Sequence, residues 1–459
     1  MTRPTARALL AATIVGLLTI AVGCGNSKGS SAPSTTAPAT TAAGGTSNGG
    51  GDATRDKFVP RPGVPGVTDK EISYAVIGTK TGNPLGICIL DCYTAGIKAY
   101  FAYRNDQGGI YGRKLVVGEV LDDELAQNQQ KSLSVISDKN IFGAFSATLL
   151  PAGWGDLDAA GVPTYTWGIH AADSANRAAN FPSQVVRCPD CPRATVPYVA
   201  SKSGATKAAS IGYGVSENSK VCTQTWADAF KKYQKDSGVQ LAYTNADLQY
   251  GLPNGIGPEV SAMKAAGVDF IATCIDLNGM KTLAQELKRQ GMDDVVLYHP
   301  NSYDQTFVGK SGDLFEGDAV VVGFRPLEAD AGTSTLDDFK KWMAKQGVAP
   351  SELAMVGWIN ASLAFDGLLA AGPEFDRAKV ISATNSLTDW TADGLLEPVD
   401  WTKAHTPYTA ANPENDPECV ALVRVRSGKF VPFDSPSKPW LCFDESSSTR
   451  FEPAPTNFE

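Results

Sequence analysis

Short apolar runs alternate with longer segments of helical periodicity from residue 71 onward. The first four runs are bounded by Gly and polar residues, as strands are, and they read EISYAVIG (71–78), KLVVGEVL (114–121), IFGAF (141–145) and VPTYTW (162–167). Apolar residues at helical spacing predict helices between them, at 93–109, 125–138 and 151–160. This alternation predicts an α/β fold with a parallel sheet covered by helices on both faces.

A second series of the same kind follows residue 194. Strands are predicted at 208–215, 240–245, 269–275 and 294–300, and helices at 223–237, 258–266 and 279–290. The strand 319–326 then leads to three helical stretches, at 335–346, 352–371 and 375–387, which return the chain to the first series. The tail 419–433 predicts a hairpin around residues 427–429. Two series predict two lobes.

The N-terminal segment predicts export. Arg3 and Arg7 precede an apolar run at 8–22, which is shorter than the roughly 20 residues of a membrane-spanning helix and suits a secretory signal. The run ends at Cys24 in a motif that resembles the lipobox of bacterial lipoproteins, so we expect lipidation at Cys24 and a location on the outer face of the cell membrane. An ordinary signal peptide with a chance Cys is the alternative, because Ala21 stands where Leu is commoner.

Residues 25–56 are almost all Gly, Ser, Thr, Ala, Pro and Asn. Such a composition buries too little apolar surface to offset the entropy of ordering, and it predicts a flexible tether. As a random coil, this tether has an end-to-end distance of about 30 Å, enough to hold a folded body away from a membrane.

Eight cysteines remain besides Cys24, and an even number in an exported protein favours disulfides. Two pairs are neighbours in sequence, one pair flanks a C-terminal segment and two cysteines remain, which gives Cys88–Cys92, Cys188–Cys191, Cys419–Cys442 and Cys222–Cys274. The alternative interprets CPDC at 188–191 as a redox motif or half of a zinc site. A zinc ribbon needs a second CxxC nearby, so we expect structural disulfides and no metal.

Composition and motifs argue against an enzyme and against a nucleic-acid partner. The chain has 459 residues, 43% of them apolar, enough for two or three domains with substantial cores. It has only three His and neither GxSxG nor HExxH, and GKS at 309–311 lacks the first glycine of a phosphate-binding loop. We therefore expect no catalytic residue and no cofactor. The net charge of −9 disfavours nucleic acid and anionic membrane surfaces.

The third predicted strand ends in Ser146, Ala147 and Thr148, just before a helix. Hydroxyl groups and the free backbone N–H groups of a helix start together suit a ligand carboxylate or another polar edge without a full positive charge. Alternatively, Thr148 only caps the helix.

The segment NDQGGIYGRKL (105–115), followed by paired aspartates at 122–123, resembles the substrate-binding proteins of branched-chain amino acid ABC transporters, the Leu/Ile/Val type of periplasmic binding protein. The resemblance extends from GVTDKEI at 66–72 through IFGAFSAT and AAGVP to about residue 330, and more loosely to about 440. The segments CILDC at 88–92 and CPDCPR at 188–193 and the cysteine-bearing tail depart from the pattern, so the ligand is not assumed to be leucine.

The resemblance implies the type I periplasmic binding protein fold: two Rossmann-like lobes, parallel sheets flanked by helices, joined by a three-crossover hinge. Hinge crossings are then expected near residues 190, 322 and 398. The expected organisation is a signal peptide at 1–23, a lipid-anchored linker at 24–60, lobe 1 at 61–190 and 323–398, and lobe 2 at 191–322 and 399–445.

The same resemblance assigns ligand contacts at the strand ends of both lobes. They are Ser146, Ala147, Thr148, Thr166, Trp167 and Thr81 in the first lobe, and Asp276, Asn301 and Tyr303 in the second. Asp276 would pair with an ammonium group, with a helix cap as the alternative. Trp167 is alternatively a core aromatic residue, and Thr81 is alternatively part of a plain turn.

The function implied is capture of a small polar ligand, an amino acid or a related compound, and its delivery to the permease and ATPase subunits of an ABC importer. A monomer is expected. Two alternatives stay open at the level of sequence: an extracellular sensor of the same fold that signals through a partner, and a binder of a sugar or polyol.

Overall fold

The computed structural model describes residues 54–150, 153–300, 303–330, 334–414, 416, 418–444 and 451–458. All of these residues belong to one folded unit that spans Gly51–Glu459. The predicted signal peptide, the lipidation site Cys24 and most of the tether lie outside the described residues.

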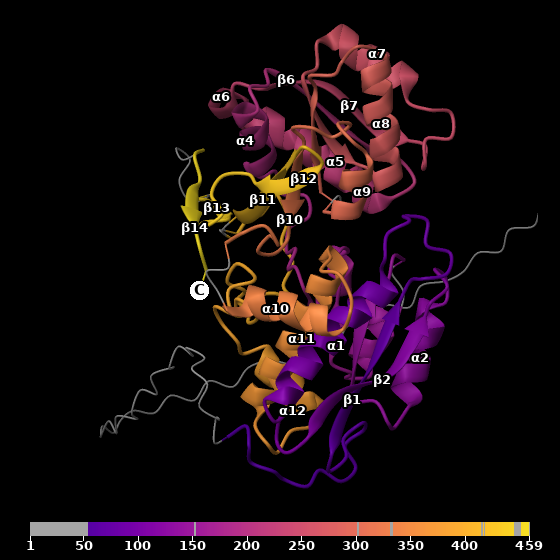
Figure 1. Ribbon diagram of the computed structural model, residues 1–459, viewed down its shortest axis with the longest axis vertical. Helices are drawn as coiled ribbons and strands as arrows, with labels where there is room; N and C mark the ends of the chain where they lie inside the picture. Colours follow the sequence, from indigo (N-terminus) through magenta and orange to yellow (C-terminus); the bar gives the residue numbers. More distant parts are fainter. Residues whose placement is uncertain are drawn as a thin grey trace, which may run out of the picture. The chain divides into compact units, whose positions relative to one another are not determined.

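The first lobe is built on a five-stranded sheet of order β2-β1-β3-β4-β5, in which every pair is parallel. Its strands are β1 (Glu71–Gly78), β2 (Lys114–Asp122), β3 (Gly143–Ala147), β4 (Thr164–Thr166) and β5 (Asn180–Pro182). The helices between them are α1 (Leu90–Asp106), α2 (Asn128–Ser137), α3 (Trp154–Ala159) and the short 3-10 helix η1 (Ala171–Asp173). As Figure 1 shows, the later helices α10 (Ser334–Lys345), α11 (Glu352–Ala371) and α12 (Arg377–Thr384) return to this lobe.

The second lobe contains a nine-stranded mixed sheet. Its parallel part is β7-β6-β8-β9-β10, formed by β6 (Lys207–Tyr213), β7 (Gln240–Leu248), β8 (Phe270–Cys274), β9 (Val296–His299) and β10 (Ala319–Val322). Antiparallel strands extend it: β11 (Glu418–Arg426), β12 (Lys429–Pro432), β13 (Trp440–Phe443) and β14 (Ala454–Thr456). The helices are α4 (Thr195–Lys202), α5 (Glu217–Lys232), α6 (Gln234–Ser237), α7 (Gly257–Ala266), α8 (Leu277–Arg289) and α9 (Gln305–Lys310).

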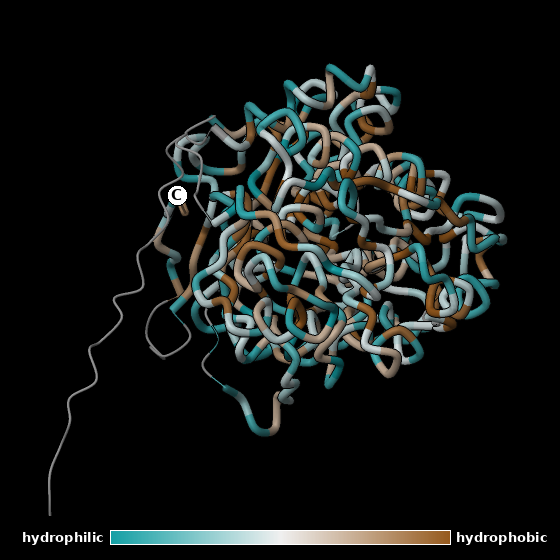
Figure 2. Tube along the Cα trace, turned by 90° about the horizontal axis from the view of Figure 1, so that it is seen from below, coloured by the Kyte–Doolittle hydropathy of each residue, from teal (hydrophilic) through white to brown (hydrophobic). Residues whose placement is uncertain are grey.

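Helix α11 forms the centre of the first lobe's core. Ser351 caps its start by accepting the Ala354 N–H, and almost every residue of the helix is buried. Among the described residues it is the one helix long and apolar enough to cross a membrane, and 83% of that apolar stretch is buried inside the protein. Figure 2 shows the same distribution along the chain, with hydrophobic stretches inside and hydrophilic ones at the outer turns.

Four disulfides join Cys88 to Cys92, Cys188 to Cys191, Cys222 to Cys274 and Cys419 to Cys442, the pairs expected from the sequence. Cys222–Cys274 connects α5 to the end of β8, and Cys419–Cys442 joins β11 to β13. Cys188–Cys191 lies in the first connection between the lobes and packs against Tyr408. Because the two sulfur atoms of CPDC are bonded to each other, they are not metal ligands in this structure.

The structure differs from the sequence assignment at several boundaries. Residues 54–60, assigned to the linker, contact the first lobe, because Arg55 donates to the Gly109 carbonyl at 2.6 Å and the Val59 carbonyl accepts from Arg113 at 2.8 Å. Residues around Trp401 and His405, assigned to the second lobe, pack on Phe181 of the first. Strand β14 carries the second lobe's sheet past residue 445. The bounds of the two lobes as a whole remain a prediction.

Candidate functional site

The carboxyl ends of β3 and β4 lie side by side and bring the predicted hydroxyl residues together. Ser146 is in register with Ile77 of β1 and with Thr166 of β4, and its carbonyl accepts the Trp167 N–H at 2.9 Å. Strand β3 includes Ser146 and Ala147, the two residues that follow the apolar run IFGAF. Ligands bind at this edge of open parallel sheets, because the strand ends and the following loops form the crevice there.

Thr148 has the most distinctive side chain at this edge. It is only 3% exposed, and its Oγ1 atom is buried without a hydrogen-bond partner among the described residues. A buried hydroxyl left without a partner costs about 1–3 kcal/mol, so a bound water or a ligand atom is expected to satisfy it. A polar ligand atom at this strand end would supply the missing partner.

The turn after β1 is held by the paired aspartates of the sequence motif. Asp122 accepts the backbone N–H groups of Lys80 and Thr81, and Asp123 accepts the Thr79 hydroxyl at 3.1 Å. Burial acts to raise the pKa of Asp122, but the hydrogen bonds from Thr81, Glu124 and Lys80 outweigh it and lower the pKa. Thr81 itself is exposed and is part of this turn, which is the alternative role that the sequence allows. The aspartates therefore shape the loop beside the strand ends.

Thr166 and Trp167 occupy the end of β4. The Thr166 hydroxyl donates to Asp173 Oδ2 at 2.7 Å, so its proton is already directed into the protein. Trp167 is 8% exposed, belongs to the main hydrophobic core, and accepts the Ser183 hydroxyl at its carbonyl. These contacts give both residues structural roles, and their predicted ligand contacts stay predictions.

In the second lobe, Asp276 follows β8 and caps helix α8. Its carboxylate accepts the N–H groups of Asn278 and Gly279, both at 3.3 Å, and the hydroxyl of Tyr213. The alternative role given by the sequence, a helix cap, is therefore present. With three donors already bound, the carboxylate has little capacity left for a ligand ammonium group.

Tyr303 lies inside the protein, 5% exposed, with its ring against Phe324 and Phe430. Its hydroxyl donates to Glu328 and accepts the Leu327 N–H at 2.7 Å, which ties it to the second connection between the lobes. Asn301, the other residue predicted in this loop, lies outside the described residues.

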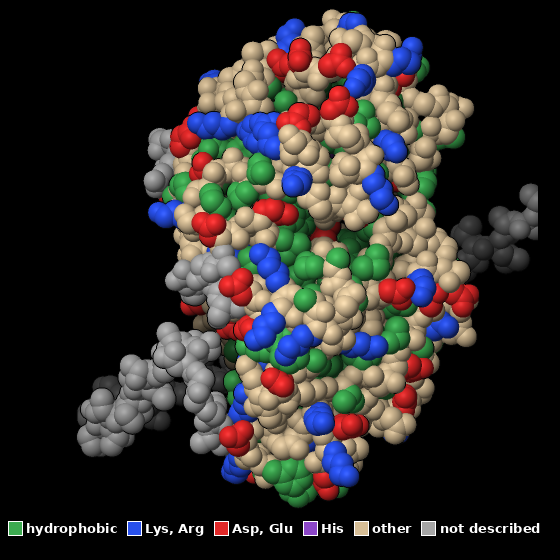
Figure 3. Space-filling view, viewed as in Figure 1, with side chains coloured by type: hydrophobic (Ala, Val, Ile, Leu, Met, Phe, Trp, Pro, Cys, Tyr) green, Lys and Arg blue, Asp and Glu red, His purple; other side chains and the backbone are tan. Residues whose placement is uncertain are grey.

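Strand-end residues that the sequence did not single out carry much of the exposed apolar surface. Leu150, Ile169, Val215 and Tyr250 follow β3, β4, β6 and β7, and they are 46%, 39%, 77% and 43% exposed. The sequence places Val215 at the end of an apolar strand, so its exposure was not predicted. Figure 3 shows hydrophobic side chains around the hollow in the middle of that face, with acidic atoms inside it and acidic and basic side chains interspersed over the rest of the face.

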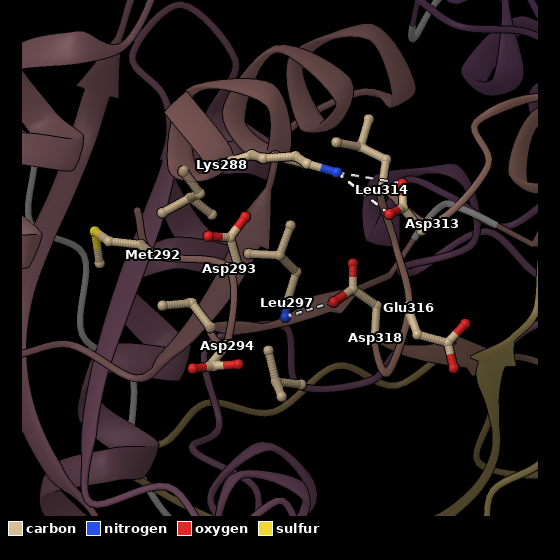
Figure 4. A pocket seen from close by; sticks show the side chains of 13 residues that line it. Lys288, Met292, Asp293, Asp294, Leu297, Asp313, Leu314, Glu316 and Asp318 are labelled. Atoms are coloured by element: carbon tan, nitrogen blue, oxygen red, sulfur yellow. Dashed lines mark hydrogen bonds and ion pairs between the residues drawn. The ribbon is translucent and has the colours of Figure 1, made fainter. Parts of the chain in front are cut away.

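Two cavities of about 440 and 530 Å³ lie elsewhere in the second lobe. The first, shown in Figure 4, is lined by the C-terminal half of α8, β9 and residues 313–318, and Lys288 forms an ion pair with Asp313 beside it. Asp318 in its wall is already bonded to the Leu297 N–H and to His299. Neither cavity is lined by a predicted ligand residue or by a residue at the carboxyl ends of β3, β4, β6 or β8.

Two lobes, one with a parallel sheet and one with a mixed sheet, joined by three connecting segments define a bilobed α/β protein. The chain matches the periplasmic binding protein family over residues 71–429 and belongs to that family. No curated protein sequence matches it.

Solved structures of the same fold accompany this match. A leucine-binding protein from Thermotoga maritima is 15% identical, with a TM-score of 0.61 and coverage of 78% of this chain and 97% of that chain. A branched-chain amino acid ABC transporter protein from Thermus thermophilus with bound valine is 17% identical, with coverage of 80% and 96% and a TM-score of 0.61. An ABC transporter solute-binding protein from R. palustris in complex with 4-hydroxybenzoate is 18% identical, with coverage of 79% and 95% and a TM-score of 0.60.

Proposed function

We propose that this chain captures a small ligand at the strand ends of its two lobes and delivers it to an ABC importer. The single observation that carries the site is the Thr148 hydroxyl, which is buried at the end of β3 without a partner among the described residues. Ser146, 2% exposed and opposite Thr166, stands beside it. The family and the transporter proteins of the same fold favour import over sensing.

The ligand proposed has a polar or anionic end and an apolar body. The polar end suits Ser146 and Thr148, which are neutral donors, while the exposed Leu150, Val215 and Tyr250 offer apolar contact area. The Asp276 carboxylate is occupied by the cap of α8 and by Tyr213, so an ammonium group is less well provided for. Apolar carboxylic acids fit this arrangement better than sugars or polyols, whose many hydroxyls need more polar partners.

The protein acts as a binding protein and not as an enzyme in this proposal, since its strand ends hold hydroxyls, a capping carboxylate and apolar side chains rather than an assembled nucleophile and base. The N-terminal sequence supports a lipid anchor at Cys24 and a location on the outer face of the cell membrane. The flexible composition of residues 25–56 would let the folded unit turn above that surface.

A thermal-shift screen tests the proposal and identifies the ligand. Amino acids, aliphatic and aromatic carboxylic acids, sugars and polyols are added singly to the purified protein. A compound present at one hundred times its dissociation constant stabilises the folded state by about 2.7 kcal/mol, which raises the unfolding temperature measurably. We expect the largest shift from an apolar carboxylic acid. A shift confined to sugars or polyols would contradict the ligand class, and no shift from any compound would contradict the proposed capture.

A further inference from the structure

One pair of side chains joins the two lobes beside the proposed ligand site. Asn218 lies in the first turn of α5, in the second lobe, and its side-chain amide donates to His170 Nδ1 and to the Ile169 carbonyl at 3.4 Å. His170 and Ile169 belong to the loop that follows β4 in the first lobe. The contact therefore connects the loop at one strand end directly to the opposite lobe.

The other face of His170 is anchored in the first lobe. Its Nε2 atom lies 3.0 Å from the carbonyl oxygen of Leu149, the residue after Thr148, and its ring packs against Trp154 at 5.3 Å between centroids. One imidazole thus joins the loops after β3 and β4 to the start of α5. Any separation of the lobes at this place must break its contact with Asn218.

The hydrogen-bond partners define the protonation state that the contact requires. A carbonyl only accepts, so Nε2 must carry a proton, and Nδ1 must be unprotonated to accept from the Asn218 amide. In a protonated imidazole, Nδ1 carries a hydrogen and faces the Asn218 NH₂ group, so two donors oppose each other and the hydrogen bond is lost. Rotation of the amide would present its oxygen to His170, but it would remove the hydrogen bond to the Ile169 carbonyl.

The surroundings of His170 favour the neutral form. Burial lowers its pKa, against the opposing effect of the hydrogen bonds to Leu149 and Asn218. Among the described residues, no charged side chain forms a hydrogen bond or an ion pair with the imidazole. The titratable groups on the elements packed around His170 are bonded to other groups or exposed. Asp173 accepts from Thr166, and Asp156 of α3 accepts from Gln129. Arg177 donates to the Ala172 carbonyl, and Glu217, beside Asn218, is exposed.

We propose that Asn218 and His170 form a latch that holds the two lobes together over the ligand and that opens when His170 is protonated. They are positioning residues, which act on the ligand by way of the loops that carry Thr148 and Trp167. The role of the latch in ligand binding rests on the proposed capture, but the opening of the latch can be measured without ligand.

The expected pH dependence follows from linkage. When the latch opens, His170 returns to solvent and to an ordinary pKa near 6.5, so the open form binds more protons than the latched form. The latched form is therefore favoured above about pH 6.5 and is weakened below it, by up to about tenfold per pH unit.

Hydrogen exchange of the full mature chain, without ligand, tests the latch. Amide protection is measured by mass spectrometry at pH 7.5 and pH 5.5, with correction for the intrinsic exchange rate, in peptides that cover residues 168–174 and 216–222. We expect both peptides to lose protection together at pH 5.5. Equal corrected protection of both peptides at the two pH values would overturn the latch.

Three variants separate the latch from other causes. His170→Gln keeps a neutral amide and is expected to lose the pH response, whereas Asn218→Asp supplies an acceptor for the imidazolium and is expected to reverse it, with more protection at pH 5.5. Asp173→Asn removes the other titrating group of the loop, whose neutral form favours protection at the lower pH, so this variant should lose at least as much protection at pH 5.5 as the wild type. A response that disappears in Asp173→Asn, or that keeps its sign in Asn218→Asp, would contradict the latch.

The outcome is distinct from that of the ligand screen. A pH-dependent change in protection without any thermal shift would leave the latch standing and contradict the proposed capture. A ligand that binds with no change in protection between the two pH values would do the reverse.

Discussion

Asp173 places a carboxyl group in the interior of the first lobe, next to the end of β4. It is 2% exposed, one oxygen accepts the Thr166 hydroxyl at 2.7 Å, and its backbone carbonyl accepts from Asn180 at 2.8 Å. Burial raises its pKa to about 7, although the hydrogen bonds from Thr166, Ser174 and Gly168 act in the opposite direction. Ionising this group within the folded protein is therefore costly near neutral pH.

We expect Asp173→Asn to change how stability depends on pH. The folded-state pKa is raised from an ordinary 3.8, so the stability that the neutral carboxyl supports is complete below about pH 4 and is lost as the pH rises through 7. The loss is on the order of 4 kcal/mol for a shift of this size. Denaturant unfolding from pH 4 to 8 should show a smaller decline for the variant than for the wild type. Parallel curves would refute the assignment.

At the level of single residues, the sequence located the strand end but not the roles of its side chains. Ser146 and Thr148 could be singled out because two hydroxyls interrupt an apolar run, a signal that is local in the sequence. The sequence around Asp276 and Tyr303 does not predict their hydrogen-bond partners, Tyr213 and Glu328, because those partners come from other strands and connections. The Asn218–His170 contact joins two lobes and has no local signature.

Helices α1 and α11 pack closely because glycines remove the side chains between them. A Cβ atom on Gly96 would lie 1.8 Å from the Ala354 carbonyl oxygen, and one on Gly357 would lie 2.2 Å from the Tyr93 carbonyl oxygen. Both contacts are with backbone, which cannot move aside as a flexible side chain can. Nearby, Asn360 of α11 donates to the Tyr93 hydroxyl at 2.7 Å and to the Thr166 carbonyl at 2.8 Å, so this packing supports the end of β4.

Gly96→Ala should therefore force the two helices apart and lower the free energy of unfolding by about 1–3 kcal/mol, the usual cost of overpacking. Gly155→Ala is the matched control, because α3 leaves space there and the nearest atoms, of the Arg177 side chain, are 3.9 Å away. The control should be neutral or stabilising by up to about 1 kcal/mol, since Ala favours a helix over Gly. Equal effects in chemical denaturation would contradict the close approach.

Elements with strong periodicity were predicted well and short ones were missed. Strand β1 has the bounds that the sequence predicted, and the three late helices lie within a few residues of α10, α11 and α12. The missed strands β5 and β14 have three residues each, too few for an alternating pattern. Helix α4 has no side-chain cap and contains Pro197, so its sequence lacks the usual start signal. These elements form because β5 and β14 pair with neighbouring strands and α4 packs its buried residues against the rest of the protein.

On the scale of the whole molecule, the folded unit is separate in sequence from the predicted anchor. The described body has its own sheets, cores and four disulfides. The predicted lipid site at Cys24 and the low-complexity residues 25–56 precede it. Capture for an importer requires the body to stay near the membrane, which the anchor would provide.

Cys24→Ala is expected to release the protein from the membrane into the soluble or secreted fraction, because a signal peptide cleaved without lipidation leaves no anchor. Fractionation of cells with immunoblotting measures this directly. If the variant stays with the membrane after a carbonate wash, the lipid-anchor prediction is wrong.

The central claim is that the Thr148 hydroxyl binds the ligand at the end of β3, and isothermal titration of Thr148→Val with the compound from the thermal-shift screen tests it most directly. Thr164→Val is the control, because the Thr164 hydroxyl is buried on β4 but donates to the Val162 carbonyl at 2.9 Å. Loss of the ligand hydrogen bond should weaken binding by Thr148→Val about 5- to 150-fold, or about 1–3 kcal/mol. The unfolding temperature without ligand should stay the same or rise, because valine removes a buried hydroxyl that has no partner among the described residues. Thr164→Val should lose stability and keep its affinity. Wild-type affinity in Thr148→Val would contradict the account.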